Sequence, residues 1–247
     1  MGCKISILAV VIALSTLASQ VCFSADVLSE YRTGHFEGLI PKIEKKISES
    51  EIADVAGLVR TAEDVAVLRL HRLDGLAGVY RAALKKTLPS MQAFRYQERL
   101  NQVTLNSHVA RTSAADEITT ALKLHKQGQG LLVGLPPYPK AEGFFLVSSA
   151  FLLEALTHSP ADAQKSDALF ALTESLVHLF PGKEISYLEE FVRSFPKDKR
   201  AREAFDDLKE KIADSYRVQG HTSELPEREM ALLKELEAKI PLVKKTR

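Results

Sequence analysis

Apolar residues recur at steps of three and four along most of the chain, which is the spacing of amphipathic helices. The longest such run lies in residues 51–88, where Ile52, Val55, Val59 and Ala62 begin a stripe that continues to Leu84. Sustained alternation of apolar and polar residues, which is typical of β-strands, is nearly absent. The pattern predicts an all-α fold, with helical hairpins stacked as a short α-solenoid or packed as an irregular bundle.

Proline, glycine and capping residues indicate where these helices begin and end. Gly75 and Gly78 can bend or divide the 51–88 stretch, because glycine weakens a helix interior by about 1 kcal/mol. Ser113 is an expected N-cap, and so is Ser159, which Pro160 follows at the first helical position. We expect helices over residues 26–32, 36–47, 51–88, 91–109, 113–127, 141–157, 159–180, 184–195, 199–218 and 225–240.

The clearest interruption of the helical pattern is the Gly/Pro-rich segment of residues 128–140. Its apolar composition predicts that it packs against something. We interpret it as a connecting loop between an N-terminal helical region, residues 25–127, and a C-terminal helical region, residues 141–247.

Residues 1–24 have the pattern of a signal peptide. Lys4 precedes an apolar run over residues 5–18, and Cys22 and Ser24 place small residues before a cleavage site at Ala25. We therefore expect export to the periplasm or secretion. An uncleaved N-terminal anchor is the alternative, and lipidation at Gly2 or at Cys22 fits the surrounding residues less well.

Charge and cysteine content follow from this interpretation. The chain has 33 basic and 32 acidic residues, and Lys4 is the only charged residue before Asp26. The mature chain would be neutral, which argues against a general binder of nucleic acid or anionic membranes. We expect no nucleic-acid partner, and membrane contact only through an uncleaved signal peptide. Removal of Cys3 and Cys22 leaves no thiol and no disulfide.

An internal repeat is visible in the second half of the chain. Residues 168–174 and 204–210 share small, apolar and acidic positions at an offset of 36. Between them, the segment 187–198 ends a helix at Phe195 and Pro196 and continues with a polar start to the next helix. This arrangement resembles the joint between repeats of tetratricopeptide-like proteins of the bacterial envelope.

The resemblance covers mainly residues 141–218, with a shorter match within residues 26–47, and it is absent from residues 51–140. It implies stacked helical hairpins, whose apolar faces bury one another and leave a concave groove. It also implies that the groove binds peptides or partner helices without catalysis. We therefore expect an adaptor or assembly factor of the cell envelope, whose partner is another envelope or secreted protein.

Candidate chemistry is sparse, and no catalytic motif is present in the sequence. The pairs Glu154/His158 and Glu174/His178 each place a carboxylate and an imidazole on one helix face, where they could share a metal ion. Both histidines also lie near predicted helix ends, where a cation and an ion pair stabilise a helix without any metal. We favour that interpretation and expect no metal site, no cofactor and no enzymatic activity.

An aromatic cluster beside the loop supports a second hypothesis. Tyr138, Phe144, Phe145 and Phe151 could line an apolar ligand pocket, although such clusters more often form part of a core. The alternative function is therefore a soluble enzyme or a carrier of apolar ligands, with a pocket around residues 128–151. The charge-dense segment 197–217 is expected to be a solvated helix face.

Overall fold

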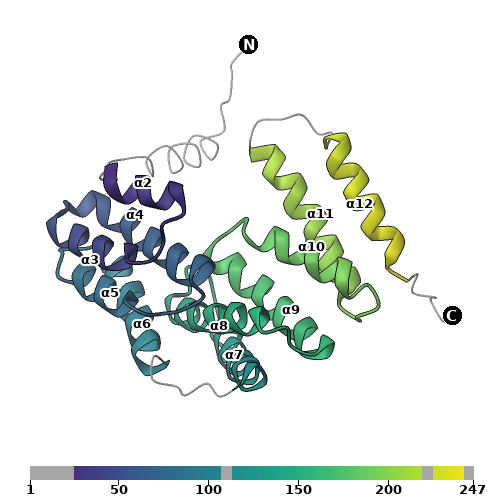
Figure 1. Ribbon diagram of the computed structural model, residues 1–247, viewed down its shortest axis with the longest axis horizontal. Helices are drawn as coiled ribbons and strands as arrows, with labels where there is room; N and C mark the ends of the chain where they lie inside the picture. Colours follow the sequence, from purple (N-terminus) through teal and green to yellow (C-terminus); the bar gives the residue numbers. More distant parts are fainter. Residues whose placement is uncertain (1–24, 107–112, 219–224, 242–247) are drawn as a thin grey trace, which may run out of the picture. The chain divides into compact units, whose positions relative to one another are not determined.

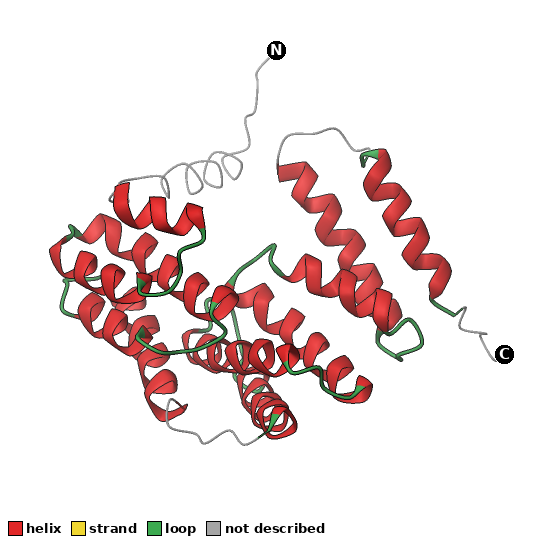
Figure 2. Cartoon of the chain, in the orientation of Figure 1, coloured by secondary structure: helices red, strands yellow, loops and turns green. Residues whose placement is uncertain are grey.

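A computed structural model describes residues 25–106, 113–218 and 225–241. In these three ranges the chain forms helices and connecting loops without a β-strand (Figures 1 and 2). The predicted all-α class is confirmed. The predicted signal peptide and both cysteines lie outside the described residues, as does the C-terminal tail after residue 241.

Eleven α-helices and one π-helical turn are present in the described ranges. They are α2 (Ala25–Thr33), α3 (Leu39–Glu49), α4 (Ile52–Glu63), η1 (Asp64–Arg69), α5 (Leu76–Leu84), α6 (Ser90–Asn106), α7 (Ala114–Gln129), α8 (Pro139–Thr157), α9 (Asp162–Leu179), α10 (Glu184–Ser194), α11 (Ala201–Val218) and α12 (Glu227–Lys239). Over the same ranges, none of these helices combines the length and the apolar composition that crossing a bilayer requires.

The helices belong to two compact units. The first comprises described residues of Met1–Val109 together with Leu135–Gly143, and the second those of Ala110–Gly134 and Phe144–Arg247. This division differs from the predicted boundary at residues 128–140. Helix α7 belongs with the C-terminal helices because it packs against α9, where His125 contacts Ser175. The connecting loop is also shorter than predicted, since α7 ends at Gln129 and α8 begins at Pro139.

The core of the first unit forms where α3, α4 and α5 pack together. Leu39, Ile43 and Ile47 are spaced by four residues, so they share one face of α3, and all three are fully buried. Val79 and Tyr80 of α5 are equally buried. The amphipathic stripe that indicated a helix at residues 36–47 therefore also identified its core face.

The long helix expected over residues 51–88 is divided. After α4, the backbone N–H of Leu70 donates to the carbonyl of Val65, which is the wider spacing of a π-helix. The chain then turns at Leu70–Gly75, where Gly75 has a φ of 82°. A β-carbon at Gly75 would lie 2.8 Å from a methyl group of Ile40. Glycine therefore permits both the left-handed turn and the close approach of α3.

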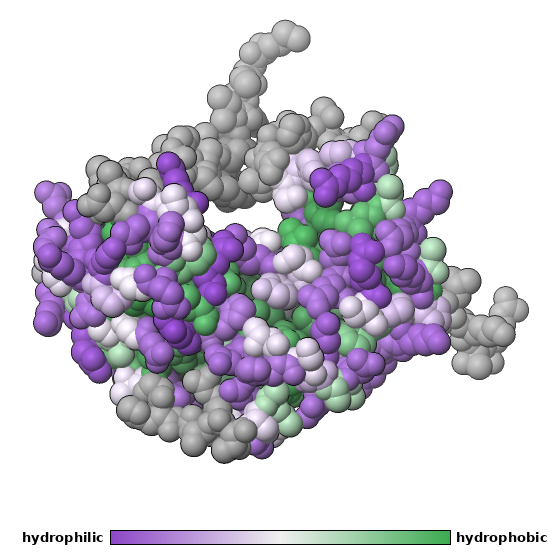
Figure 3. All heavy atoms as spheres, viewed as in Figure 1, coloured by the Kyte–Doolittle hydropathy of each residue, from purple (hydrophilic) through white to green (hydrophobic). Residues whose placement is uncertain are grey.

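In the second unit, helices α9 to α12 pack each against the next. Their shared core contains residues from all four helices: Leu169, Leu188, Phe191, Val192, Ala204, Phe205, Leu208, Ile212, Leu233, Leu236 and Ile240. Helices α11 and α12 run antiparallel, and apolar residues are visible between them in the space-filling view (Figures 1 and 3).

The positions that repeat at an offset of 36 have the same environment in α9 and α11. Ala168 and Leu172 are fully buried in α9, and Ala204 and Leu208 are fully buried in α11. The small and apolar positions of the repeat therefore face the core, whereas its acidic position, Glu174 or Glu210, does not.

The two predicted N-caps have different outcomes. Ser113 caps α7 as expected, because its hydroxyl accepts a hydrogen bond from the backbone N–H of Asp116. The prediction for Ser159 is wrong, since α9 begins at Asp162 and its N-cap is Ala161. Ser159 instead has a φ of 50°, the left-handed conformation that commonly follows the end of a helix, and it terminates α8.

The loop between α7 and α8 is exposed. Val133 retains 80% and Leu135 retains 90% of its accessible surface, and Leu131 is also exposed. Only Leu132 and Tyr138 in this loop are half-buried. The described residues therefore leave most of the apolar loop uncovered, and the expectation that it packs against something stays a prediction. Buried residues of α7 and α8 themselves stabilise the positions of these helices, so packing of the loop is not required.

Candidate functional site

A pocket of about 590 Å³ opens on the surface of the second unit. One wall is formed by the first two turns of α9 and the other by the joint between α10 and α11. The residues that line it are Asp162, Ala163, Ser166, Asp167, Ser194, Phe195, Pro196, Lys197, Asp198 and Arg200. Phe195 and Pro196, which end a helix in the sequence pattern, lie in this joint, and the sequence pattern predicted no ligand role for them.

The local sequence explains why the chain turns here. Helix α10 ends at Ser194, and Pro196 cannot continue it because proline lacks a backbone N–H. Asp198 then accepts a hydrogen bond from the backbone N–H of Arg200 at 2.9 Å. An aspartate that binds the backbone two residues later stabilises a tight turn, and α11 begins directly afterwards.

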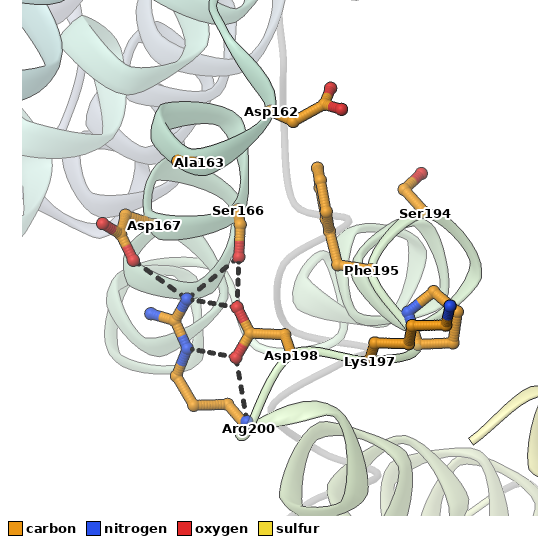
Figure 4. A pocket seen from close by; sticks show the side chains of 10 residues that line it. Asp162, Ala163, Ser166, Asp167, Ser194, Phe195, Lys197, Asp198 and Arg200 are labelled. Atoms are coloured by element: carbon orange, nitrogen blue, oxygen red, sulfur yellow. Dashed lines mark hydrogen bonds and ion pairs between the residues drawn. The ribbon is translucent and has the colours of Figure 1, made fainter. Parts of the chain in front are cut away.

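Arg200 and Asp198 form the polar side of the pocket (Figure 4). The guanidinium donates through Nε and Nη2 to the two carboxylate oxygens of Asp198, at 2.9 and 2.7 Å. The same Nη2 lies 2.9 Å from the hydroxyl of Ser166 and 2.9 Å from a carboxylate oxygen of Asp167. Ser166 also donates to Asp198. These contacts fasten the joint to α9.

Aromatic rings support the guanidinium from the core side. The Arg200 Cζ atom lies 4.9 Å from the ring centre of Phe170 and 5.6 Å from that of Phe191. Hydrogen bonds from Arg200, supported by Ser166 and opposed by partial burial, lower the pKa of Asp198 well below its ordinary value. The carboxylate therefore stays ionised and paired in any mildly acidic solution.

Phe195 forms the apolar side of the pocket. Its ring is half-buried and lies 6.0 Å from that of Phe191, and it takes no part in the polar cluster (Figure 4). Asp162 and Lys197 are exposed at the margin. Because the ionic groups of Asp198 and Arg200 already bind each other, the pocket is suited to hold an apolar side chain against Phe195 rather than to activate a substrate.

We expect the Asp198→Asn variant to unfold more easily at neutral pH, by about 1–2 kcal/mol, because hydrogen bonds to a charged group are lost in a partly exposed cluster. Because the pKa of Asp198 is lower in the folded chain than in the unfolded chain, where it is about 3.9, ionised Asp198 stabilises the fold above about pH 3.9. This stabilisation is lost as the pH falls from about 3.9 toward the pKa of the folded chain. Urea unfolding followed by circular dichroism at pH 7 and pH 3 would therefore show a smaller difference at pH 3.

The matched control is Asp206→Asn, which changes an exposed aspartate in the middle of α11. We expect this substitution to change stability by less than about 0.5 kcal/mol at either pH. An Asp198→Asn variant as stable as the wild type at pH 7 would show that the cluster does not hold the joint.

The aromatic residues predicted to bind a ligand occupy different environments. Phe145 and Phe151 are buried in the core of the second unit, with exposed fractions of 1% and 0%. Phe144 is half-buried in the same helix, and Tyr138 is half-buried in the first unit. Phe145 fills space that a side chain at Gly128 would occupy, since a β-carbon there would lie 2.7 Å from its ring.

A buried histidine lies beside Phe145. His125 places Nδ1 2.9 Å from the hydroxyl of Ser175 and Nε2 3.1 Å from a carboxylate oxygen of Glu174. Serine, histidine and glutamate in this order resemble the groups of a hydrolase. Ser175 is completely buried, however, so its hydroxyl is not accessible to a substrate. The cluster satisfies polar groups within the core.

The residues considered for metal binding are arranged in other ways. Glu174 contacts His125, and His178 stacks on Phe145 with ring centres 5.0 Å apart. His158 follows the last residue of α8. Across the described parts of the chain, no three histidine, cysteine or acidic residues form a group that could hold a metal ion.

The expectation that residues 197–217 form a solvated helix face is wrong at two positions. The side chains of Arg200 and Asp198 are only 21% and 16% exposed because both contact α9 across the joint. The sequence contained a local indication, since Asp198 and Arg200 follow the proline that ends α10. Their partners on α9 are more than 30 residues away, and no pattern in the sequence connects them.

A second polar cluster was also missed. In the first unit, Arg99 donates to buried carboxylates of Glu63, at 2.5 Å, and Glu142, at 2.8 Å. Tyr80 donates to Glu63 at 2.7 Å, and Arg95 forms a further ion pair with Glu142. Burial opposes the charge on Arg99, but the two carboxylates and Tyr80 outweigh it and raise the pKa of the guanidinium. The two arginines balance the negative charges of the two glutamates. Because the arginines and the glutamates lie on different helices, the cluster holds these helices together.

Comparisons with protein-family models, with curated proteins and with solved structures found no match for this chain.

Proposed function

We propose that this protein is an exported, non-catalytic adaptor or assembly factor of the cell envelope, which binds another envelope or secreted protein. The pocket between α9 and the α10–α11 joint would receive an apolar side chain of the partner. The observation that carries the proposal is the combination of an open pocket, the half-buried ring of Phe195 and ionic groups that already pair with one another.

The helical repeat supports the same conclusion. Helices α9 and α11 bury equivalent residues, and α10 and α12 follow each of them in the packing order. Stacked hairpins of the tetratricopeptide-like type bind partner segments in grooves between helices. The resemblance at residues 141–218 and the pocket, which lies within the same segment, both support protein binding.

The arrangement of polar groups favours binding over catalysis. The one serine–histidine–glutamate arrangement noted above lies in the core, and its hydroxyl is inaccessible. Phe145 and Phe151, proposed as lining of a carrier pocket, are fully packed. Both observations weaken the alternative of an enzyme or apolar-ligand carrier built around residues 128–151.

Site-specific crosslinking would test the proposal. A photoreactive phenylalanine analogue at position 195 would be expressed in the full chain in its own cells, and crosslinked products would be identified by mass spectrometry. The N-terminus of the recovered protein would show whether cleavage occurs before Ala25. We expect a defined envelope protein to be crosslinked from position 195 and not from Met230, an exposed residue of α12.

With the purified partner, Phe195→Ser should weaken binding by about 30-fold, because truncation of a central aromatic residue typically removes about 2 kcal/mol. Met230→Ala, the matched control, should leave the affinity within about twofold. Phe195→Leu, which keeps apolar volume, should restore part of the affinity. Equal affinities for all three variants would rule out this pocket. Recovery of lipid or metal without a protein partner would contradict the adaptor function.

A further inference from the structure

The exposed loop between α7 and α8 is apolar throughout. From Leu131 to Pro137 the chain contains leucine, valine, glycine and proline and no polar side chain. Leu131, Val133 and Leu135 are exposed by 39%, 80% and 90%. Isolated exposed apolar residues are common, but several of them close together mark a surface that binds something.

The charge on either side of this loop has a single sign. Between Glu117 and Glu142 the sequence contains no acidic residue, whereas it contains Lys123, Lys126 and Lys140. All three lysines are exposed. Among the described residues none of them forms an ion pair with a carboxylate. In a chain that is neutral as a whole, the sequence around this apolar segment thus carries an excess of positive charge, although one carboxylate, that of Glu174, contacts Gln129 at the end of α7.

We propose that the loop of residues 131–137 inserts into the interface of a membrane rich in anionic lipids. Apolar side chains at the tip of a loop partition into the boundary between head groups and acyl chains, and lysines beside them attract anionic head groups. A half-buried Tyr138 follows the loop, and tyrosine is enriched at this boundary.

Charge complementarity favours a lipid surface over an apolar groove of a protein. Protein interfaces are depleted of lysine, whereas a surface of anionic lipids attracts it. The proposal does not depend on the adaptor function, since the loop and the pocket at Phe195 are separate features. The loop would be a membrane contact in addition to the N-terminal segment. This contact depends on the lysines near the loop and not on the net charge of the chain.

The absence of tryptophan from the chain allows a precise test. Val133→Trp would place the only tryptophan in the loop, and Met230→Trp would place it on exposed α12 as the matched control. Each full-length variant would be mixed with vesicles of phosphatidylcholine alone, or of equal parts phosphatidylcholine and phosphatidylglycerol. Both variants contain the apolar run of residues 5–18, which could bind a vesicle by itself. The measurement therefore follows the single tryptophan and not the binding of the whole chain.

We expect the emission of tryptophan at position 133 to shift to shorter wavelength and to be quenched by brominated lipid, with anionic vesicles only. Position 230 should show neither effect. Adding Lys123→Gln, Lys126→Gln and Lys140→Gln should lower the partition coefficient by about tenfold or more. Unchanged emission at position 133, or an equal response to both vesicle types, would overturn the proposal. If the emission at position 133 shifted to shorter wavelength without lipid, and the shift grew with protein concentration, the loop would instead be a contact between copies of this protein.

Discussion

Replacement of Arg99 by methionine is expected to lower the free energy of unfolding by about 3–5 kcal/mol, the largest effect of any single substitution considered for the first unit. Arg99 is 7% exposed and pairs with two carboxylates, each less than 10% exposed. Methionine would keep the volume but leave Glu63 and Glu142 buried without their cation. Urea unfolding, with hydrogen exchange on peptides from α4 and α6, would measure the loss and locate it.

Two further variants make this result interpretable. Arg81→Met removes an exposed arginine from α5 and should change stability by less than about 0.5 kcal/mol. Combining Arg99→Met with Glu63→Gln and Glu142→Gln removes the uncompensated charges and leaves an acceptor for Tyr80, so at least half of the lost stability should return. An Arg99→Met variant within 1 kcal/mol of the wild type would show that the cluster is not closed in solution.

Replacement of Phe191 by alanine should destabilise the second unit by about 3–5 kcal/mol, because truncation of a fully buried aromatic residue leaves a cavity. Its ring lies 5.5 Å from that of Phe170 and 6.0 Å from that of Phe195, and it also supports Arg200. Hydrogen exchange on peptides from α9 to α11 should increase most. Phe195, which lines the pocket, would lose the ring that it packs against.

Phe195→Ala provides the comparison, because Phe195 is only half-buried and its truncation should cost about half as much. Phe191→Leu should retain most of the stability through the remaining apolar volume. If Phe195→Ala were as destabilising as Phe191→Ala, Phe195 would be a core residue and could not be the binding surface of the pocket.

Helix formation could be predicted largely from local sequence. Ser113 capped α7 as expected, and the stripe of Leu39, Ile43 and Ile47 identified the buried face of α3. Boundaries that depend on backbone conformation were less predictable. Ser159 was assigned to the start of α9, but its left-handed conformation ends α8. Serine is a frequent N-cap and seldom adopts a left-handed conformation, so the local sequence favoured the role that the structure does not show.

The candidate site was predicted only in part. Phe195 and Pro196 marked the joint between α10 and α11, but the residues that complete the pocket lie on α9. Ser166 and Asp198 are 32 residues apart, and their hydrogen bond exists because α9 packs against α10. The ligand pocket expected around residues 128–151 rested on aromatic composition alone, and composition does not distinguish a binding surface from a core.

By itself, the sequence determined the helical class, the equivalence of the buried positions in α9 and α11, and the near balance of charge, because these follow from composition and short-range periodicity. The tertiary structure decided which charges are buried, as at Arg99 and Arg200, and which apolar residues are exposed, as at Val133 and Leu135. Burial depends on neighbours that are distant in the chain. A pattern that repeats every three or four residues contains no information about them.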